Sequence, residues 1–130
     1  MTDLGKLLAR VMFSLIFVAA GAHKILTFAV TSTMMADKGI PMADVLLIVA
    51  IIMELGGGLM ILFGFRARLG AFMIFLFIIP VTFVFHSFWM FDGSESVVQM
   101  QQLLKNLAMM GGALYIMVVG SGKLSLDKGK

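Results

Sequence analysis

One acidic side chain lies in the middle of a long apolar stretch of this sequence. Residues 43–63 are apolar except near their ends and at Glu54. A stretch of about 20 apolar residues matches the hydrocarbon thickness of a bilayer and predicts a membrane-spanning helix. A carboxylate near the centre of such a helix costs several kcal/mol unless it is paired, protonated or hydrated. Glu54 therefore needs a partner elsewhere in the chain, or a function that retains it.

Four further polar residues lie in the other apolar stretches: Lys24, His86, Lys105 and Asn106. If successive stretches cross the membrane in alternating directions, all five residues lie in the same half of the bilayer, with Glu54 about 15 Å below that surface. One interpretation is structural: Glu54 pairs with Lys24 or Lys105 and fixes the helix register. The other is functional: carboxylate, imidazole and amines line a pocket for a polar headgroup, a quinone ring or a transported proton. The residues alone leave both interpretations open.

The composition indicates that the elements holding these residues are membrane helices. The 130 residues are 61% hydrophobic and only 13% charged, and the mean hydropathy is +1.06, whereas about 25% of residues are charged in soluble domains. The length accommodates four spans and short loops, so we predict a single all-α domain, an integral membrane four-helix bundle running up-down-up-down. The predicted spans are residues 7–28, 43–63, 69–90 and 98–119, followed by a polar tail over residues 120–130.

Local features refine this expectation. Pro80 should kink the third span and free a backbone carbonyl, and Thr82 lies close enough to offer it a hydroxyl. Glycines 56–58 follow Glu54 and should let a neighbouring helix approach closely. Residues 30–37 of the first loop can form a short interfacial helix. The first span has signal-peptide features, but its length and its direct continuation favour a retained span.

The absence of cysteine narrows the chemistry. Without thiols the chain has no disulfide, thiolate nucleophile, cysteine-ligated metal or CxxC redox motif. The two histidines, His23 and His86, are far apart in sequence. We therefore expect no metal site, no covalently bound cofactor and no catalytic residue acting alone. The net charge of +3 bears on membrane orientation rather than on nucleic acid, which is not expected as a partner.

The distribution of Lys and Arg predicts the orientation. One side of a four-span arrangement carries Lys6, Arg10, Arg66, Arg68, Lys123, Lys128 and Lys130. The other side carries Lys38, with Lys24 and Lys105 at the span edges, together with Asp37, Asp92 and Glu95. Both termini and the middle turn should then face the cytoplasm, and the polar cluster should open outward. The cytoplasmic half should contain no ionisable group beyond the residues at the span ends.

Several short motifs follow one another along nearly the whole chain. They are residues 20–25 (AGAHKI), 39–41 (GIP), 54–59 (ELGGGL), 62–68 (LFGFRAR), 85–86 (FH), 105–108 (KNLA), 111–112 (GG) and 120–127 (GSGKLSLD). Their order and spacing resemble the DoxX family of small bacterial four-span inner-membrane proteins. At the last motif the family often has Gly-Pro-Gly. The resemblance implies a bacterial inner-membrane location and marks Lys24, Glu54, His86, Lys105 and Asn106 as candidate site residues.

The resemblance implies a function in outline. DoxX proteins are similar to the membrane subunit of an archaeal thiosulfate:quinone oxidoreductase, and others are linked to oxidative-stress complexes. The resemblance implies a redox-associated membrane subunit that binds quinone. Such a subunit would rely on a redox partner chain, because this sequence shows no flavin, haem or iron–sulfur motif. Distant relatives look like cargo receptors or assembly chaperones, so the alternative is a membrane scaffold, lipid or hydrophobic-ligand binder, or assembly factor. A third hypothesis is a small proton-coupled transporter, with Glu54 as carrier, acting as a homo-oligomer.

Overall fold

The computed structural model describes residues 2–85 and 88–128, which are mostly helical, with no strand among them. The elements are α1 (Asp3–Leu26), α2 (Phe28–Asp37), α3 (Ala43–Ile51), η1 (Ile52–Gly56), α4 (Gly57–Phe63), α5 (Ala67–Phe85), η2 (Phe88–Met90) and α6 (Gly93–Val119). Here η1 is a π-helical turn and η2 a 3₁₀ turn. The predicted all-α fold is confirmed.

Four helical stretches are long and apolar enough to cross a membrane: Asp3–Leu26, Ala43–Phe63, Ala67–Phe85 and Gly93–Val119. The second is continuous through α3, η1 and α4 and has the predicted bounds. The first begins earlier than predicted because the Thr2 hydroxyl accepts a hydrogen bond from the Gly5 N–H and caps the helix. The fourth begins earlier because its polar first turns contain Glu and Gln, which are good helix formers.

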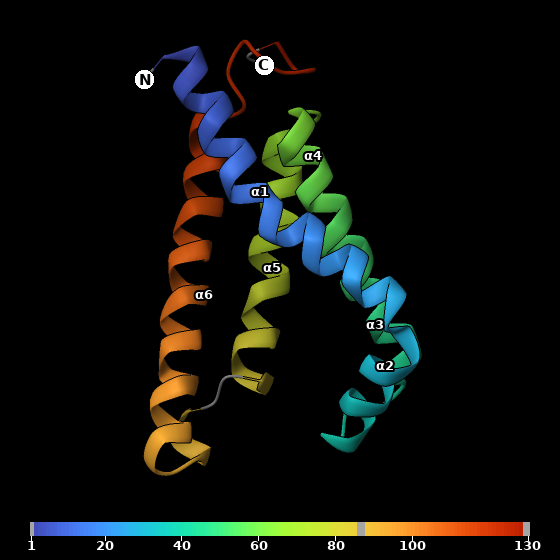
Figure 1. Cartoon of the computed structure of the whole chain (residues 1–130). Helices are drawn as coiled ribbons and strands as arrows, with labels where there is room; N and C mark the ends of the chain where they lie inside the picture. The colour runs from blue at the N-terminus through green and yellow to red at the C-terminus, as the bar shows by residue number, and fades with distance from the viewer. Residues whose placement is uncertain (1, 86–87, 129–130) are drawn as a thin grey trace.

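Successive spans run in opposite directions (Figure 1). Both termini and the turn between α4 and α5 lie at one end of the molecule, which we call the closed end. At the opposite, open end, α2 and the start of α3 diverge from α5 and α6 (Figure 1). α5 packs against α4 and α6, and α1 packs against α4 and η1, whereas α1 and α6 make little contact. The molecule is therefore tightly packed at one end and splayed at the other.

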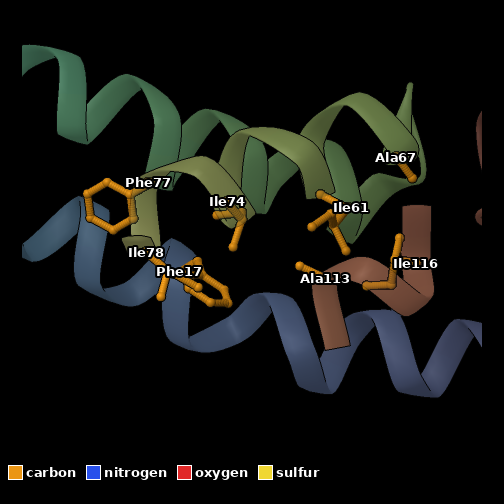
Figure 2. Close-up of a cluster of buried hydrophobic side chains, with 9 residues drawn as sticks. Phe17, Ile61, Ala67, Ile74, Phe77, Ile78, Ala113 and Ile116 are labelled. Atoms are coloured by element: carbon orange, nitrogen blue, oxygen red, sulfur yellow. The ribbon is translucent and has the colours of Figure 1, made fainter. Parts of the chain in front are cut away.

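The apolar core lies between α1, α4, α5 and α6, with side chains from all four facing one another (Figure 2). Its buried residues are Phe17, Ile61, Ala67, Ala71, Ile74, Phe77, Ile78, Ala113 and Ile116. The predicted close approach at the glycines occurs between α4 and α5. A Cβ atom on Gly57 would lie only 2.8 Å from the carbonyl oxygen of Gly70. Large apolar side chains such as Leu26 and Met12 remain exposed, as expected for helices that face lipid.

Two local predictions can be compared with the structure. The short helix expected over residues 30–37 forms and is longer than predicted, because α2 begins at Phe28, directly after the break at Thr27; its location at the membrane interface stays a prediction. α5 continues through Pro80, whose missing N–H cannot bond to the carbonyl of Leu76. The Thr82 hydroxyl does not replace that donor: it donates to the Ile78 carbonyl at 2.7 Å. The expected partner of Thr82 was therefore wrong, and the expected kink stays a prediction.

Candidate functional site

Glu54 lies in the π-helical turn η1, inside the second span. π-Helical turns inside α-helices frequently occur at functional sites. The residue is 5% exposed, and its Oε1 atom accepts a hydrogen bond from Lys24 Nζ at 2.6 Å. Lys24 comes from the last turn of α1. Of the two lysines considered as partners for Glu54, the structure places Lys24 in contact with it.

Lys24 also lies over an aromatic ring. Its Nζ atom is 5.9 Å from the centroid of the Phe77 ring on α5. An ammonium group over an aromatic face is attracted by the negative charge of the ring face. Lys24 thus links three spans: its own helix, the carboxylate of the second span and a ring of the third.

Asn106 is buried on α6 and joins it to α5. Its Nδ2 atom donates to the Thr82 hydroxyl at 3.0 Å, and Thr82 in turn donates to the Ile78 carbonyl. Both side chains are buried, so the bond satisfies polar groups that would otherwise be costly in an apolar interior. The Asn106 amide therefore has a structural partner, and its position also places it on the wall of a pocket.

A pocket of about 360 Å³ lies between the helices at the level of Glu54. Its polar lining residues are Lys24, Thr31, Glu54, Lys105 and Asn106, and the rest of its lining is mostly apolar side chains from α1, α2, α3, α5 and α6. Binding sites for small molecules typically enclose about 300–1,000 Å³ and combine apolar walls with a few polar groups. The pocket fits that description.

The structure thus brings four of the five candidate residues, Lys24, Glu54, Lys105 and Asn106, to the lining of one pocket. Lys105 is exposed at the pocket, and it makes no hydrogen bond or ion pair with any residue that the structure describes. The fifth candidate, His86, lies outside the described residues. Thr31 was not singled out from the sequence, because a threonine in a polar loop gives no signal until α2 places it against the pocket.

Comparison with known proteins identifies the family. The model of the DoxX family matches residues 5–87, well over half of the chain. The chain belongs to the DoxX family. This DoxX-family chain is 37% identical over 126 residues to the inner membrane protein YqjF of Escherichia coli (strain K12), covering 97% of the chain and 92% of that relative. It is 30% identical over 122 residues to the inner membrane protein YphA of the same organism, covering 94% and 87%.

No solved structure matches this DoxX-family chain. The two relatives and the four apolar spans together show a multi-pass inner-membrane protein. The family match includes Lys24 and Glu54 but ends before α6. The first three spans therefore carry the family pattern, and Lys105 and Asn106 enter the site from the helix beyond it.

Arg10, which the sequence placed among the basic residues near the start of the first span, is buried in the DoxX-family protein: it is 2% exposed and contacts the end of α4. Its Nη1 atom donates to the carbonyls of Ile61 and Leu62 at 2.9 and 3.1 Å, and Nη2 donates to the carbonyl of Leu124 at 2.5 Å. The guanidinium therefore donates to carbonyls at the end of α4, where Ile61 otherwise accepts from the Gly64 N–H at 3.2 Å.

The segment after α6 is also more than a polar tail. It returns to the α4–α5 turn, where Asp127 accepts from the backbone N–H groups of Arg66 and Ala67 at 2.9 and 3.1 Å and caps α5. Burial raises the pKa of Asp127, but these two bonds, the Ser121 hydroxyl and the charge of Arg10 outweigh it and hold the pKa below the ordinary value of an aspartate. The closed end is thus fastened by an Arg and an Asp from opposite ends of the described chain.

Proposed function

We propose that this DoxX-family protein binds a quinone or a similar amphipathic ligand in the pocket around Glu54, as the membrane subunit of a redox-associated complex. The observation that carries the proposal is the pocket itself, about 360 Å³ with a mostly apolar lining that also contains Lys24, Glu54, Lys105 and Asn106. An apolar ring with polar substituents at its edge is complementary to such a lining.

The chemistry of the wall supports a quinone head. A quinone carries carbonyl oxygens that accept hydrogen bonds, and the Lys105 ammonium is a donor without another partner among the described residues. The Lys24–Glu54 pair supplies a positioned acid and base for moving a proton to or from the ligand. In this proposal the electrons come from a partner chain, since the sequence contains no cysteine and no flavin, haem or iron–sulfur motif.

Orientation is part of the proposal. The closed end faces the cytoplasm, supported by Lys6, Arg66, Arg68, Lys123 and Lys128, which all lie in its segments. The pocket then opens toward the outer surface. Because the chain has no cysteine, a Lys123→Cys variant reports the orientation directly: it should resist a membrane-impermeant maleimide in intact cells, and labelling there would reverse the orientation.

The test is quinone binding by the purified protein in nanodiscs. A short-chain ubiquinone or menaquinone analogue at 100 times its Kd should raise the free energy of unfolding by about 2.7 kcal/mol. Glu54→Gln removes the carboxylate charge from the pocket and should weaken the stabilisation by quinone. Glu95→Gln makes the same change on the exposed first turn of α6 and should leave it unchanged. No stabilisation by any quinone would refute the proposal.

The second candidate function uses the same pocket without redox chemistry. The mostly apolar lining favours a lipid or hydrophobic-ligand binder, a scaffold or an assembly factor. Native mass spectrometry of protein extracted without detergent exchange distinguishes the two. A retained lipid or a co-purifying partner, together with no quinone response, would support the second candidate.

A further inference from the structure

We infer that the pocket around Glu54 selects a ligand with an anionic head group, a carboxylate or a phosphate ester carried on an apolar chain. The inference rests on the proposed function only in taking the pocket as a ligand site. It does not require that the ligand be a quinone.

The first argument is the balance of charge around the pocket. Lys24 and Lys105 line it, and Lys38 Nζ lies 5.4 Å from the centroid of the Phe85 ring, which forms part of its wall. Among the described residues, Glu54 is the single acidic side chain in the lining, and Lys24 already neutralises it at 2.6 Å. Lys38 and Lys105 therefore leave a surplus of positive charge at the pocket.

The neighbouring acidic residues do not remove this surplus. Asp37 lines a separate hollow formed by α2 alone. Asp44 accepts a hydrogen bond from Ser32 and fastens α2 to the start of α3. Neither lines the pocket or forms an ion pair with Lys38 or Lys105 in the part of the chain that the structure describes. An anionic ligand would supply the missing charge.

The second argument is the space for an apolar chain. A second pocket of about 260 Å³ adjoins the first between α3 and α5 and is lined almost wholly by apolar side chains. The two share Met35, Ala50, Phe77, Val81 and Phe85. In this inference the polar lining residues of the first pocket bind the head, and the apolar chain lies in the adjoining pocket, beside Pro80.

The ammonium group of Lys105 explains why the pocket should select ligands by the charge of their head group. A lysine ammonium bound to a carboxylate or phosphate oxygen forms a charge-assisted hydrogen bond, which is about twice as strong as a neutral one. An alcohol head of the same size can accept a hydrogen bond but adds no counter-charge. A neutral and an acidic ligand with the same chain should therefore differ in affinity, and the difference should depend on the charge of residue 105.

The experiment compares oleate with oleyl alcohol, which share one chain and differ in head-group charge. Binding is measured to the full-length protein in nanodiscs of zwitterionic lipid at neutral pH. The wild type should bind oleate on the order of tenfold more tightly than oleyl alcohol. Lys105→Gln should lose that preference, and Lys105→Arg should keep it. Lys123→Gln removes the same charge at the closed end, where the side chain is exposed, and should keep it too.

Further arms identify the source of the anionic head. Lysophosphatidic acid presents a phosphate on one chain, and phosphatidylglycerol presents one on two chains. A preference for oleate alone assigns a free fatty acid, and a preference shared with either phospholipid assigns a membrane lipid. Equal affinity for oleate and oleyl alcohol, or a preference that survives in Lys105→Gln, would overturn the inference.

The outcomes separate this inference from the proposed function. Quinone binding without any advantage for an acidic head would overturn the inference and leave the proposed function standing. Oleate binding that depends on Lys105, with no quinone response, would support the inference and remove the quinone from the proposed function.

Discussion

Lys24 and Glu54 form an ion pair whose two members differ in their access to the surroundings. The Nζ and Oε1 atoms are 2.6 Å apart, yet the lysine side chain is 27% exposed and the glutamate side chain only 7%. The carboxylate has little access to water, so Lys24 is its main source of charge compensation. The ammonium can extend toward the pocket and the membrane surface on its flexible stem.

This asymmetry predicts unequal effects of removing each partner. Lys24→Met leaves an unpaired carboxylate in an apolar interior and should lower the free energy of unfolding by about 3 kcal/mol. Glu54→Gln leaves an ammonium that can extend outward, and should cost about 1 kcal/mol. Unfolding by SDS in mixed micelles, followed by circular dichroism, measures both.

The double variant provides the control for this comparison. Lys24→Met with Glu54→Gln no longer buries an unpaired charge, so it should be more stable than Lys24→Met alone. Equal stability of the single and double variants would show that the loss comes from the packing of the Lys24 stem and not from the charge of Glu54.

The Asp127 cap predicts a contribution to stability that depends on pH. The pKa of Asp127 is lowered in the folded protein, so its ionised form stabilises the fold above the pKa of the unfolded chain. That contribution is lost as the pH falls through the lower folded value, below about pH 4. Asp127→Asn keeps an oxygen acceptor without the charge.

Thermal unfolding of the wild type and of Asp127→Asn, compared between pH 7 and pH 2.5, tests this prediction. The wild type should be the more stable at pH 7, and the difference should shrink toward the acid end. A constant difference over the whole range would mean that the charge of Asp127 does not contribute.

Two adjacent glycines should respond oppositely to a methyl group. In Gly57→Ala the new Cβ would lie 2.8 Å from the Gly70 carbonyl oxygen, a backbone atom that cannot move aside without shifting α5. In Gly56→Ala the nearest atom would be the flexible end of Met73, at 3.8 Å. Gly57→Ala should cost about 2 kcal/mol, whereas Gly56→Ala should be neutral or slightly stabilising. Melting temperatures in one detergent check both, and equal losses would contradict the packing argument.

The spans could be predicted from the sequence because hydropathy and length decide them almost alone. The second span has the predicted bounds, and the first and fourth begin earlier where capping or helix propensity extends the helix, as at Thr2. The first span ends at Leu26 rather than at residue 28, and the third, predicted over residues 69–90, is Ala67–Phe85 in the structure. The apolar run around Glu54 gave no sign of the π-helical turn. Such a turn depends on one extra residue in the hydrogen-bond ladder, which leaves no trace in composition.

The candidate site could be predicted only as a set of residues at a similar depth. Depth follows from counting residues along each span, but which spans are neighbours does not. The choice between Lys24 and Lys105 as partner for Glu54 therefore needed the packing of α1 against η1. The burial of Arg10 could not be predicted for a related reason: an arginine near a span end normally reaches the membrane surface. Its burial depends on a segment that returns from beyond the fourth span.

The long-range contact of Arg10 also sets an order on biosynthesis. Arg10 and Leu124 are 114 positions apart, and a ribosome adding about 5–20 residues per second needs roughly ten seconds to cover that distance. The first two spans can meet during that time, since Ile61 and Leu62 are already made, but the guanidinium still lacks its third acceptor. The closed end is completed only after α6 has entered the membrane. Until then Arg10 can bond only to the end of α4, and the docking of the segment after α6 is the last step in forming the closed end.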